Sequence, residues 1–424
     1  MKVLVVGGGG REHAVIRKLK ESKHVDAIVC APGNGGISAD AECVNIKATD
    51  VEGMVNYAVN NGIDFVCVTP DDPLALGMVD ALEAKGIPAF GPDAKAARIE
   101  ASKVFAKGLM KKYGIPTASY EVFDDPEKAL AYIKEKNSYP AVVKADGLAL
   151  GKGVLIAKDE AEAAAALKEL MVDKQFGNAG NEVVVEEFLE GPEVSVLAFT
   201  DGKVVRPMVS SMDHKRADDN DEGLNTGGMG TIAPSPFYTQ EIADRCMQEI
   251  FLPTIKAMNE EGCPFRGCLY FGLMLTKDGP KVIEYNSRFG DPETQVVLPL
   301  LDGDLFEIMK ACENGTLADV PIAWKKEAAA CVIEASGGYP EHYVKGYEIH
   351  GLNEDGQAEG VTVYHSGTKK ENGKYYTNGG RVLGITALGR DLQEALQKSY
   401  KAVETIGFEN MHYRHDIGRK ALGK

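Results

Sequence analysis

The first hundred residues alternate short apolar runs with helix-forming stretches, and this alternation limits the fold more than any other feature of the chain. The apolar runs are 2–6, 26–31 and 65–69, and the helical patterns that follow them are 12–20, 50–60 and 74–85. Repeated βα units of this kind predict a parallel, doubly wound sheet. Ligands of such sheets bind at the carboxyl ends of the strands, which here are the loops "GGGGRE", "APGNGG" and "TPDDPL".

The rest of the chain divides into two further regions. The second opens with "EASKVFAKGLMKKYGIP", which predicts one helix that ends at Gly114 and Pro116. It continues with strands in "PAVVKA", "GVLIA" and "VVVEEF", a helix at 160–171, and strands near 194–200, 204–210, 268–276 and 281–286. A third region holds short strands and turns up to a final helix at 391–406. We therefore expect a multidomain α/β protein with domains at 1–100, 101–325 and 326–424.

Composition narrows the set of partners. The chain has 424 residues, of which 26% are charged and 44% hydrophobic, as in ordinary soluble proteins. Its formal charge of -16 repels phosphate backbones, so nucleic acid is not an expected partner. The eight cysteines include no CxxC pair, which argues against a zinc site or a redox dithiol. No stretch approaches the roughly 20 apolar residues that span a bilayer, so we expect a cytoplasmic protein with no membrane partner.

A quartet of glycines, Gly7 to Gly10, follows the first apolar run and suggests a dinucleotide-binding loop. Such a loop needs G-x-G-x-x-G and an acid at the end of the second strand. Here the third glycine position is Glu12 and the second strand ends in Ala31 and Pro32, so an NAD-dependent oxidoreductase is disfavoured. The bare amides of Gly8 to Arg11, at a helix N-terminus, still suit a single phosphate. A purely structural tight turn is the alternative.

The segment "VVKADGLALGKGVLIA" resembles a P-loop but departs from its pattern. Gly147 and Gly151 enclose three residues instead of four, and Lys152 is followed by Gly153 instead of a hydroxyl residue. A strand follows the loop, so we interpret it as a glycine-rich flap whose amides close over a triphosphate. Lys144, at the end of the preceding strand, would place an ammonium group on the phosphates. The alternative is a flexible hairpin with a solvated lysine.

The run "VVVEEFLEGPEVSV" places acids directly after an apolar strand. Backbone and carboxylate groups from Glu186 to Leu189 could receive the edge of an adenine, and Glu193 could bind the ribose hydroxyls. Taken alone, the run fits a charged turn between strands better. Its distance from the glycine loop favours the nucleotide interpretation.

The densest polar cluster is "KVIEYNSRFGDPETQ", in which a strand ends in acids, amides and an arginine. On a strand, Glu284 and Asn286 share one face and lie about 6.6 Å apart by the strand rise. A carboxylate and an amide oxygen are ligands typical of Mg²⁺, which also keeps waters and substrate phosphates. Arg288 offers a planar fork for a carboxylate or a phosphoryl oxygen. A salt-bridged strand end with no ligand is the alternative.

Taken together and in this order, Lys103 in "ASKVFAK", Lys144 with its flap, the "VVEEFLEGPE" turn and the "EYNSRFGDPE" strand resemble the ATP-grasp superfamily. The segments "GGREHA", "APGNGG", "DHKRADDNDEGLNTGGMG", "RFGDPETQ" and "TNGGRVLGITALG" are similar to one of its families, the phosphoribosylamine–glycine ligases or glycinamide ribonucleotide synthetases. This resemblance covers essentially the whole chain. It implies that ATP, glycine and 5-phosphoribosylamine react through glycyl phosphate to glycinamide ribonucleotide, ADP and phosphate, in de novo purine biosynthesis.

The resemblance also implies a fold and a set of residue roles. The fold has an N-terminal doubly wound parallel sheet, a central ATP-grasp domain with a flexible lid at about 118–190, and a small C-terminal α+β domain. For ATP, the implied residues are Lys103, Lys144, Gly151, Gly153, Glu186, Glu187, Leu189 and Glu193, and for Mg²⁺ or Mn²⁺ they are Glu284 and Asn286. For the ribosylamine and glycine, they are Gly9, Gly10, Arg11, Glu12, Asn34, Gly35, Gly36, Asn225, Thr226 and Asp291. For the reaction centre, they are Asp213, Lys215, Gly228, Gly230 and Arg288.

Some details stay open at this point. His214 could face the reaction centre or be a structural loop histidine. The strand "YFGLMLT" (270–276) lacks the second metal-binding acid of many ATP-grasp enzymes, and Asp71 stands in "TPDDPLALG" where the family usually has glutamate after proline. The rival functions are another carboxylate–amine ligase, a biotin-dependent carboxylase subunit and a nucleotide-sensing protein without turnover. We expect a monomer, from the resemblance and from the lack of an obvious coiled-coil pattern or apolar patch.

Overall fold

Five parallel strands form the N-terminal sheet, as the alternation of the first hundred residues predicts. The structure is a computed structural model and describes residues 1–148 and 153–423. The strand order is β3-β2-β1-β4-β5, with bounds Lys2–Gly7 (β1), Ala27–Pro32 (β2), Glu42–Cys43 (β3), Phe65–Val68 (β4) and Ala89–Phe90 (β5). The order reverses between β1 and β4, and doubly wound sheets bind ligands at this switch point.

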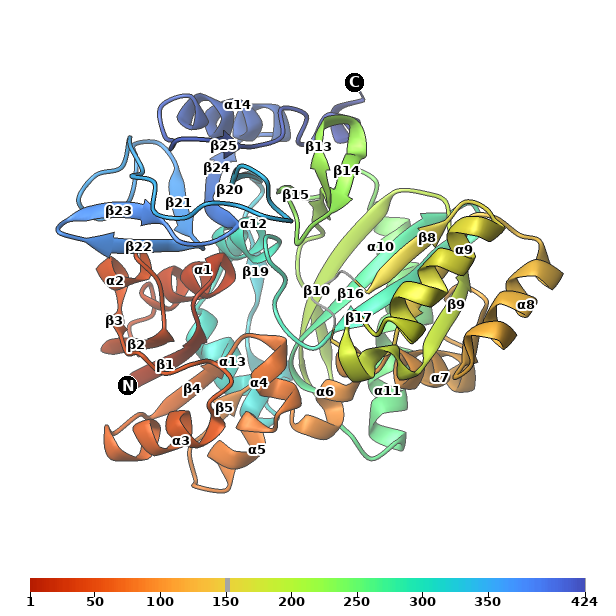
Figure 1. The fold of residues 1–424 in the computed structure, drawn as a ribbon. Coiled ribbons are helices and arrows are strands. Elements are labelled where there is room, and N and C mark those ends of the chain that lie inside the picture. The colour runs from red at the N-terminus through yellow and green to blue at the C-terminus, as the bar shows by residue number, and fades with distance from the viewer. Residues whose placement is uncertain (149–152, 424) are drawn as a thin grey trace.

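Helices cover both faces of this sheet, at the red and orange end of the chain in Figure 1. They are α1 (Gly10–Leu19), α2 (Ile37–Asp40), α3 (Val51–Asn60), α4 (Asp71–Ala75) and α5 (Met78–Glu83). The single helix predicted at 74–85 is wrong, because Gly77 adopts a left-handed φ of +81° and separates α4 from α5. Among the described residues no helix is long and apolar enough to cross a membrane.

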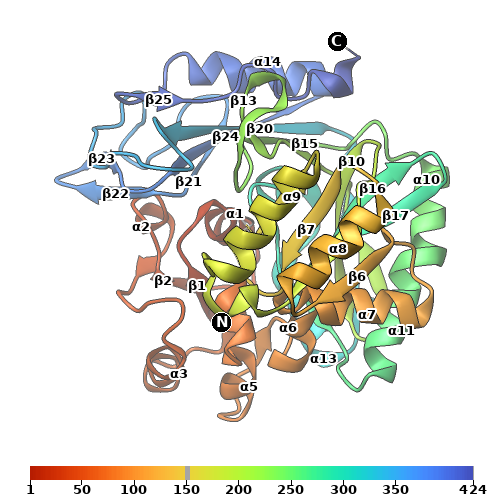
Figure 2. The same cartoon turned by 45° about the vertical axis from the view of Figure 1, so that its right-hand side comes forward.

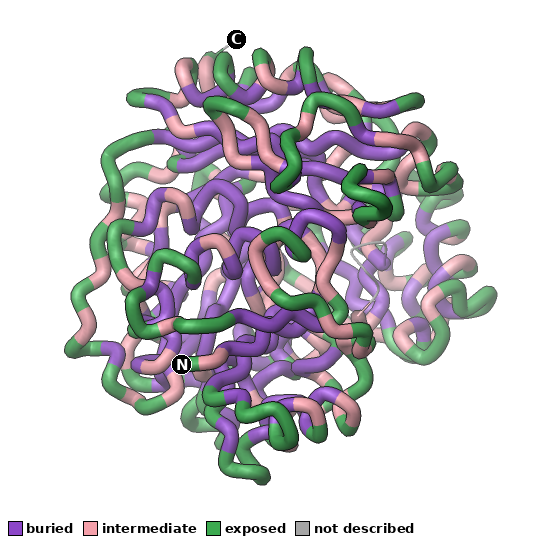
Figure 3. The backbone as a smooth tube through the Cα atoms, turned by 90° about the vertical axis from the view of Figure 1, so that its left-hand side faces the viewer, coloured by how far each residue is buried: buried purple, intermediate pink, exposed green. Residues whose placement is uncertain are grey.

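One apolar core joins the three predicted regions. It contains Val3 and Val5 of β1 and continues into α12 (Thr294–Val297), α13 (Leu305–Asn314) and β20 (Ala328–Ser336). In Figure 3 the buried backbone runs through the middle of the molecule and exposed segments surround it. The N-terminal sheet is therefore held against later parts of the chain by continuous apolar packing.

Two antiparallel sheets build the central region. The central sheet has the order β11-β10-β16-β17, and its strands are Val205–Pro207, Glu193–Asp201, Arg266–Thr276 and Gly279–Asn286. The second sheet has the order β6-β9-β7-β8, and its strands are Tyr120–Phe123, Val183–Glu187, Ala141–Ala145 and Val154–Ala157. Helices α8 (Pro126–Lys136) and α9 (Glu160–Leu167) lie in front of the second sheet in Figure 2, with the central sheet behind it. We call β6 to β9 with these two helices the lid.

The third sheet gathers strands from two regions of the sequence. It has the order β12-β15-β20-β24-β21, with β25 (Met411–His412) beside β20. Its other strands are Met212–Asp213 (β12), Gly230–Ala233 (β15), Arg381–Gly389 (β24) and Thr362–His365 (β21), and helix α14 (Leu392–Val403) packs on it. The segment between β12 and β15, which was predicted to face the reaction centre, is therefore anchored at both ends in the C-terminal sheet.

The helix predicted from Glu100 onward is interrupted at its third residue. Helix α6 spans Ala94–Ala101, Ser102 has an extended backbone, and α7 spans Lys103–Tyr113. The Ser102 hydroxyl accepts a hydrogen bond from Phe105 N at 3.0 Å, which caps the new helix. Because of this break, Lys103 is the first residue of α7.

A β-bulge shapes the strand that ends in the polar cluster. Gly272 of β16 pairs with Glu284, but the next residue, Leu273, pairs with Val282, so Ile283 is the extra residue. Val282 and Tyr285 both lie in the apolar core beneath the sheet. Glu284 is left on the face opposite Tyr285, and Asn286 shares that face.

The C-terminal sheet buries a glutamate side chain that has no hydrogen-bond partner among the described residues. Glu334 on β20 is 0% exposed, and neither of its carboxylate oxygens has a hydrogen-bond partner among the described residues. Burial raises the pKa of Glu334 well above its ordinary value. The folded protein therefore holds this side chain as the neutral acid, and the uncompensated burial costs stability.

Replacing Glu334 by methionine is expected to stabilise the protein by about 1–3 kcal/mol near neutral pH, because an unpartnered polar group leaves the core. The sign of the pH dependence follows from the raised pKa. Above the unfolded value of 4.5 the unfolded chain ionises more readily than the folded protein, whose pKa is raised, so parent stability falls as pH rises. The melting temperature of the variant should therefore exceed that of the parent by more at pH 8 than at pH 5.

The matched control is Glu359→Met, which changes an exposed glutamate of the same region. It should leave the melting temperature nearly unchanged at both pH values. A stabilisation by Glu334→Met that is equal at both pH values, or a loss of stability, would contradict the neutral buried acid.

Candidate active site

A narrow polar pocket opens beside the central sheet. Its walls come from β10, β16, β17 and the segment around β12, and its polar lining includes Glu193, Ser195, Asp213, Lys215, Tyr270 and Glu284. Four of the predicted site residues therefore meet in one pocket, although they come from three separate parts of the sequence. Glu193 lies at the exposed rim.

Glu284 is surrounded by cations. Burial by itself raises the pKa of Glu284, but Lys215, Lys144, Lys103 and Arg288 together outweigh burial and hold it below its ordinary value. The side chain is therefore a carboxylate at neutral pH. An anion among four cations suits a site in which phosphate groups and a divalent ion bind together.

Two lysines from different elements contact the carboxylate of Glu186. Lys144 of β7 lies 3.1 Å from Glu186 Oε2, and Lys107 of α7 lies 3.0 Å from the same oxygen. Lys144 also donates to the carbonyl oxygen of the bulged residue Ile283 at 3.2 Å. Lys144 thus ties the lid to the strand that ends in Glu284 and Asn286. The Glu186 carboxylate thus holds both lysines, and its predicted contact with adenine stays a prediction.

The start of α7 faces the glycine loop. Lys103 Nζ donates to Gly147 O at 2.8 Å, and Val104 N donates to Asp146 Oδ1 at 3.0 Å. Burial lowers the pKa of Lys103, while Glu284 opposes that change. The strands on either side of the loop pair as the predicted hairpin, with Lys144 opposite Val154. Gly153 is buried next to β8, and the predicted site residue Gly151 lies outside the described residues.

Lys215 lies among acids just after β12. Its Nζ is 2.9 Å from Asp213 Oδ2 and 3.9 Å from Glu293 Oε1. Tyr270 OH donates to the same Glu293 oxygen at 3.1 Å and lies 2.7 Å from Ser195 Oγ. Burial alone would lower the pKa of Lys215, but Tyr270, Asp213 and Glu293 raise it well above its ordinary value. The ammonium group therefore stays charged beside the pocket.

His214 uses both ring nitrogens in the fold. Nδ1 lies 2.9 Å from Gly230 O, and Nε2 accepts from Gly418 N at 3.1 Å. This pair of contacts fixes the neutral tautomer with the proton on Nδ1. Burial lowers the pKa of His214, in agreement with a neutral ring. His214 is a structural loop histidine that ties the C-terminal segment to β15.

The loop between β14 (Glu222–Asn225) and β15 has no room for side chains at its glycines. Gly228 has φ +123°, and a Cβ there would lie 2.5 Å from Pro292 Cδ and 2.6 Å from Asp213 Oδ1. A Cβ on Gly230, the first residue of β15, would lie 2.6 Å from Ile417 Cδ1. Thr226 Oγ1 donates to Lys215 O at 2.8 Å and accepts from Gly228 N at 2.9 Å. The loop is packed against the pocket wall by these contacts.

The expectation that the N-terminal amides are bare is wrong at two positions. Gly9 N donates to Glu12 Oε2 at 2.6 Å, and Arg11 N donates to Asp291 Oδ2 at 3.2 Å. The Arg11 side chain is engaged too, because its Nε donates to Glu12 Oε1 at 2.7 Å. The acids that cap α1 thus occupy amides that were predicted for phosphate. A capping acid three residues after a glycine is visible in the sequence, so this signal was missed.

The two N-terminal glycine loops do meet, as predicted. Asn34 Nδ2 donates to Gly8 O at 3.0 Å and to His365 O at 2.8 Å, and its Oδ1 accepts from Ile37 N at 2.9 Å. A Cβ on Gly35 would lie 2.6 Å from Lys369 C, and one on Gly36 would overlap the His365 ring. The Asn34 side chain therefore joins the loops to the C-terminal region.

Asp291 connects the three regions of the chain. Besides Arg11 N, its carboxylate accepts from Gln295 Nε2 at 2.9 Å and lies 3.4 Å from Arg381 Nη2. Arg381 Nη1 donates to Asp291 O at 2.9 Å and to Gly228 O at 3.3 Å. Arg381 was not predicted, although it lies in the segment "TNGGRVLGITALG". Arg381 thus places a positive charge from the C-terminal region beside the predicted substrate loops.

The remaining predicted residues are not among those that line the pocket. Glu187 is exposed; its Oε1 accepts from Ser119 N at 3.1 Å and lies 3.5 Å from Lys281 Nζ. Leu189 is half-buried in the turn after β9, and Gly10 is buried at the start of α1. Asn225 ends β14 opposite Arg216.

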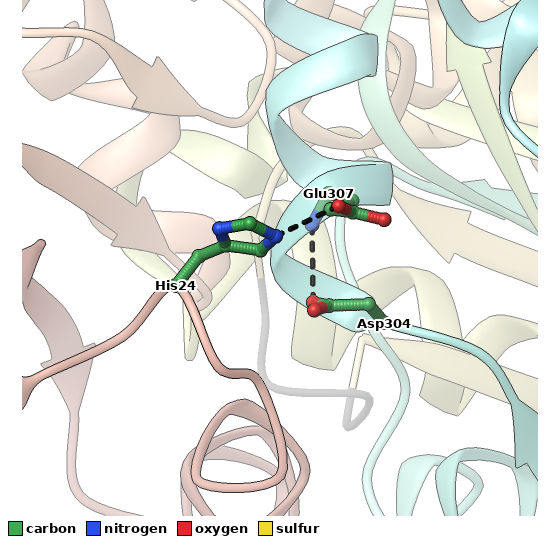
Figure 4. Close-up of side chains that lie close together, drawn as sticks. All are labelled: His24, Asp304 and Glu307. Carbon is green, nitrogen blue, oxygen red and sulfur yellow. Dashed lines mark hydrogen bonds and ion pairs between the residues drawn. The ribbon is translucent and has the colours of Figure 1, made fainter.

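One further cluster has the residue types of a metal site. His24, Asp304 and Glu307 lie together at the start of α13 (Figure 4). Asp304 is the N-cap of α13 and accepts from Phe306 N at 2.9 Å, while its other oxygen accepts from Ser22 at 2.8 Å. His24 lies 2.9 Å from Glu307. Helix capping and an exposed ion pair explain this cluster without a metal.

Known proteins resemble this chain over its length. The family models for phosphoribosylglycinamide synthetase match with the N domain at residues 1–100, the ATP-grasp (A) domain at 101–294 and the C domain at 329–420. A phosphoribosylamine–glycine ligase of Caldanaerobacter subterraneus subsp. tengcongensis is 50% identical over 417 residues, which are 98% of this chain and 99% of that protein.

Solved structures agree with this match. The crystal structure of a phosphoribosylamine–glycine ligase from Thermotoga maritima superposes with a TM-score of 0.85 at 33% identity, over 98% of this chain and 100% of that one. The biotin carboxylase domain of the Hydrogenobacter thermophilus 2-oxoglutarate carboxylase, solved with MgADP and bicarbonate, has a TM-score of 0.72 at 20% identity, over 97% of this chain and 91% of that one. The second likeness concerns the fold alone.

A lid sheet facing a central sheet, with Lys144 from the lid, Lys103 from helix α7 and a glutamate–asparagine pair at the end of β17, defines an ATP-grasp enzyme. Such enzymes include ligases. The chain belongs to the phosphoribosylglycinamide synthetase family.

Proposed function

We propose that this protein joins glycine to 5-phosphoribosylamine at the expense of ATP, through glycyl phosphate, in de novo purine biosynthesis. The observation that carries the proposal is the arrangement of Lys103, Lys144, Lys215 and Arg288 around the Glu284 carboxylate. The family and the named relatives support the choice of substrates.

The reaction needs activation because a carboxylate is a poor acyl donor. A glycine carboxylate oxygen attacks the γ-phosphorus of ATP, the bond to the β-phosphate oxygen breaks and ADP leaves. The ribosylamine nitrogen then attacks the glycyl carbon, phosphate leaves with the transferred oxygen, and the nitrogen loses a proton. This route needs no serine or cysteine nucleophile. Positioning and cancellation of developing charge are the main tasks of the protein.

Lys103 and Lys144 hold the phosphates of ATP in this proposal, under the glycine loop that contains Gly151 and Gly153. Glu186, Glu187, Leu189 and Glu193 lie on the adenosine side, with the Glu186 carboxylate acting through Lys107 and Lys144.

Glu284 and Asn286 fit a divalent ion, either Mg²⁺ or Mn²⁺, because both offer oxygen donors on one face of β17 and Glu284 is a carboxylate at neutral pH. A bound ion supplies positive charge next to the transferred phosphoryl group.

On the amine side, Gly9 to Glu12, Asn34 to Gly36 and Asp291 frame the ribose phosphate in this proposal. Asn225, Thr226, Gly228 and Gly230 close the wall next to Asp213 and Lys215. Arg288 binds the glycine carboxylate or the transferred phosphoryl group. Residues 1–100, 101–325 and 326–424 act as the three domains, with a lid at about 118–190, and the protein is a cytoplasmic monomer.

The test is product identification by mass spectrometry with MgATP, glycine and freshly prepared ribosylamine. ADP and glycinamide ribonucleotide should form together, and omission of either glycine or ribosylamine should abolish both. ADP release stimulated by a different amine, or by bicarbonate, would contradict the proposal and support another carboxylate–amine ligase or a carboxylase. Nucleotide binding without any turnover would support a sensor.

A further inference from the structure

Glu100, on the last turn of α6, binds three consecutive residues at the end of β17. Its Oε2 accepts from Ser287 N and from Ser287 Oγ, both at 2.8 Å. Its Oε1 lies 2.8 Å from Arg288 Nη2. Glu100 is 9% exposed, so its carboxylate is bound by these protein groups and has little contact with solvent. Neither the sequence motifs nor the proposed reaction assigns a task to Glu100.

Glu100 Oε1 also determines the orientation of the Asn286 side-chain amide. With the amide oriented so that its nitrogen donates, Asn286 Nδ2 lies 2.9 Å from Glu100 Oε1 and 3.2 Å from Tyr285 O. The opposite orientation would place the amide oxygen against two acceptors. A carboxylate has no donor, so Glu100 selects the orientation in which the nitrogen faces it and Oδ1 is left for a cation.

Arg288 is held by the same carboxylate. Apart from its pair with Glu100, Arg288 donates a long hydrogen bond from Nη1 to Phe289 O at 3.4 Å, and its buried Nε has no hydrogen-bond partner in the described chain. The described contacts of the Glu100 carboxylate all come from donors, which are Ser287 N, Ser287 Oγ, the Arg288 guanidinium and the Asn286 amide nitrogen. One carboxylate thus fixes a predicted metal ligand and a predicted phosphoryl-binding arginine.

We propose that Glu100 is a positioning residue of this site, which orients the Asn286 amide oxygen toward the divalent ion and holds Arg288 in place. Glu100 acts through these side chains and touches no reacting atom. Partners behind metal ligands commonly change metal affinity or activity by about 10–100-fold when they are removed. This inference rests on the proposed function only in that the same site binds the ion.

The test measures Mn²⁺ affinity in the presence of ADP, by electron paramagnetic resonance of free Mn²⁺, so that neither glycine nor ribosylamine is involved. Glu100→Gln should weaken Mn²⁺ binding by about 10-fold or more, because the new amide nitrogen competes for the Asn286 oxygen. Asn286→Asp should also weaken it, because two carboxylates then face each other.

The double variant Glu100→Gln with Asn286→Asp separates orientation from mere packing. The carboxylate of an aspartate at position 286 has two equivalent oxygens, so its orientation does not matter. A glutamine at position 100 can donate to one of these oxygens while the other faces the ion. Mn²⁺ affinity should therefore return to within about threefold of the parent. Glu83→Gln, which changes an exposed glutamate paired with Arg266, is the control and should leave the affinity unchanged.

Two results would overturn the proposal. One is unchanged Mn²⁺ affinity in Glu100→Gln, and the other is a folded double variant that binds Mn²⁺ no better than the weaker single variant. If Glu100→Gln does not fold, the affinity of the double variant relative to Asn286→Asp decides in the same way. A failure to form glycinamide ribonucleotide would leave these binding results intact, so the two proposals can fail separately.

Discussion

Glu284→Gln is expected to lower turnover by about 10²–10³ at saturating metal, which is typical of the loss of one preorganised electrostatic contact. The change keeps the size of the side chain but removes the anion whose charge four nearby cations stabilise. An amide also presents a donor to lysines that need an acceptor. The measurement is kcat with ATP, glycine and ribosylamine saturating, over a series of Mg²⁺ concentrations.

The matched control for this prediction is Glu307→Gln. Glu307 belongs to the cluster with His24 and Asp304, whose contacts are explained by capping and an ion pair. This variant should keep the kcat and the Mg²⁺ dependence of the parent. A normal kcat in Glu284→Gln would show that Glu284 does not hold the metal ion. A changed Mg²⁺ dependence in Glu307→Gln would indicate that the ion binds at the cluster of His24, Asp304 and Glu307.

The second large effect is expected from Lys144→Met, which should lower kcat/KM for ATP by about 10²–10³. Lys144 contacts Glu186 of the lid at 3.1 Å and Ile283 O of β17 at 3.2 Å, so its removal affects both sides of the proposed nucleotide site. Methionine keeps the apolar stem and removes the charge. Steady-state kinetics with varied ATP provide the measurement.

Lys134→Met provides the comparison, because Lys134 lies on helix α8 of the same lid and forms an exposed ion pair with Glu160. Its kinetics should stay close to those of the parent. If both variants behave alike, Lys144 has no special part in nucleotide binding and the assignment of the triphosphate site is wrong.

Local sequence patterns predicted those parts of the site that are formed by residues close together in the sequence. The strand that ends in Glu284 and Asn286, the hairpin after Lys144 and the parallel N-terminal sheet all follow from hydrophobic alternation and glycine spacing. Lys107 follows Lys103 by one helical turn, so its place beside Glu186 could have been inferred as well.

Contacts between distant segments could not be predicted in this way. Glu100 and Ser287 are 187 residues apart. The sequence also did not predict the break at Ser102, which separates the helix that carries Glu100 from α7. The bulge at Ile283 and the arrival of Arg381 at Asp291 likewise depend on how separate elements pack. The amides of Gly9 and Arg11 were misjudged because the acids that occupy them act as caps.

The most direct test of the proposed chemistry uses glycine labelled with ¹⁸O in both carboxylate oxygens. The proposed route predicts that one labelled oxygen per turnover appears in inorganic phosphate, and only when ribosylamine is present to complete the reaction. Formation of the product with unlabelled phosphate would contradict an acyl phosphate and, with it, the account of this site.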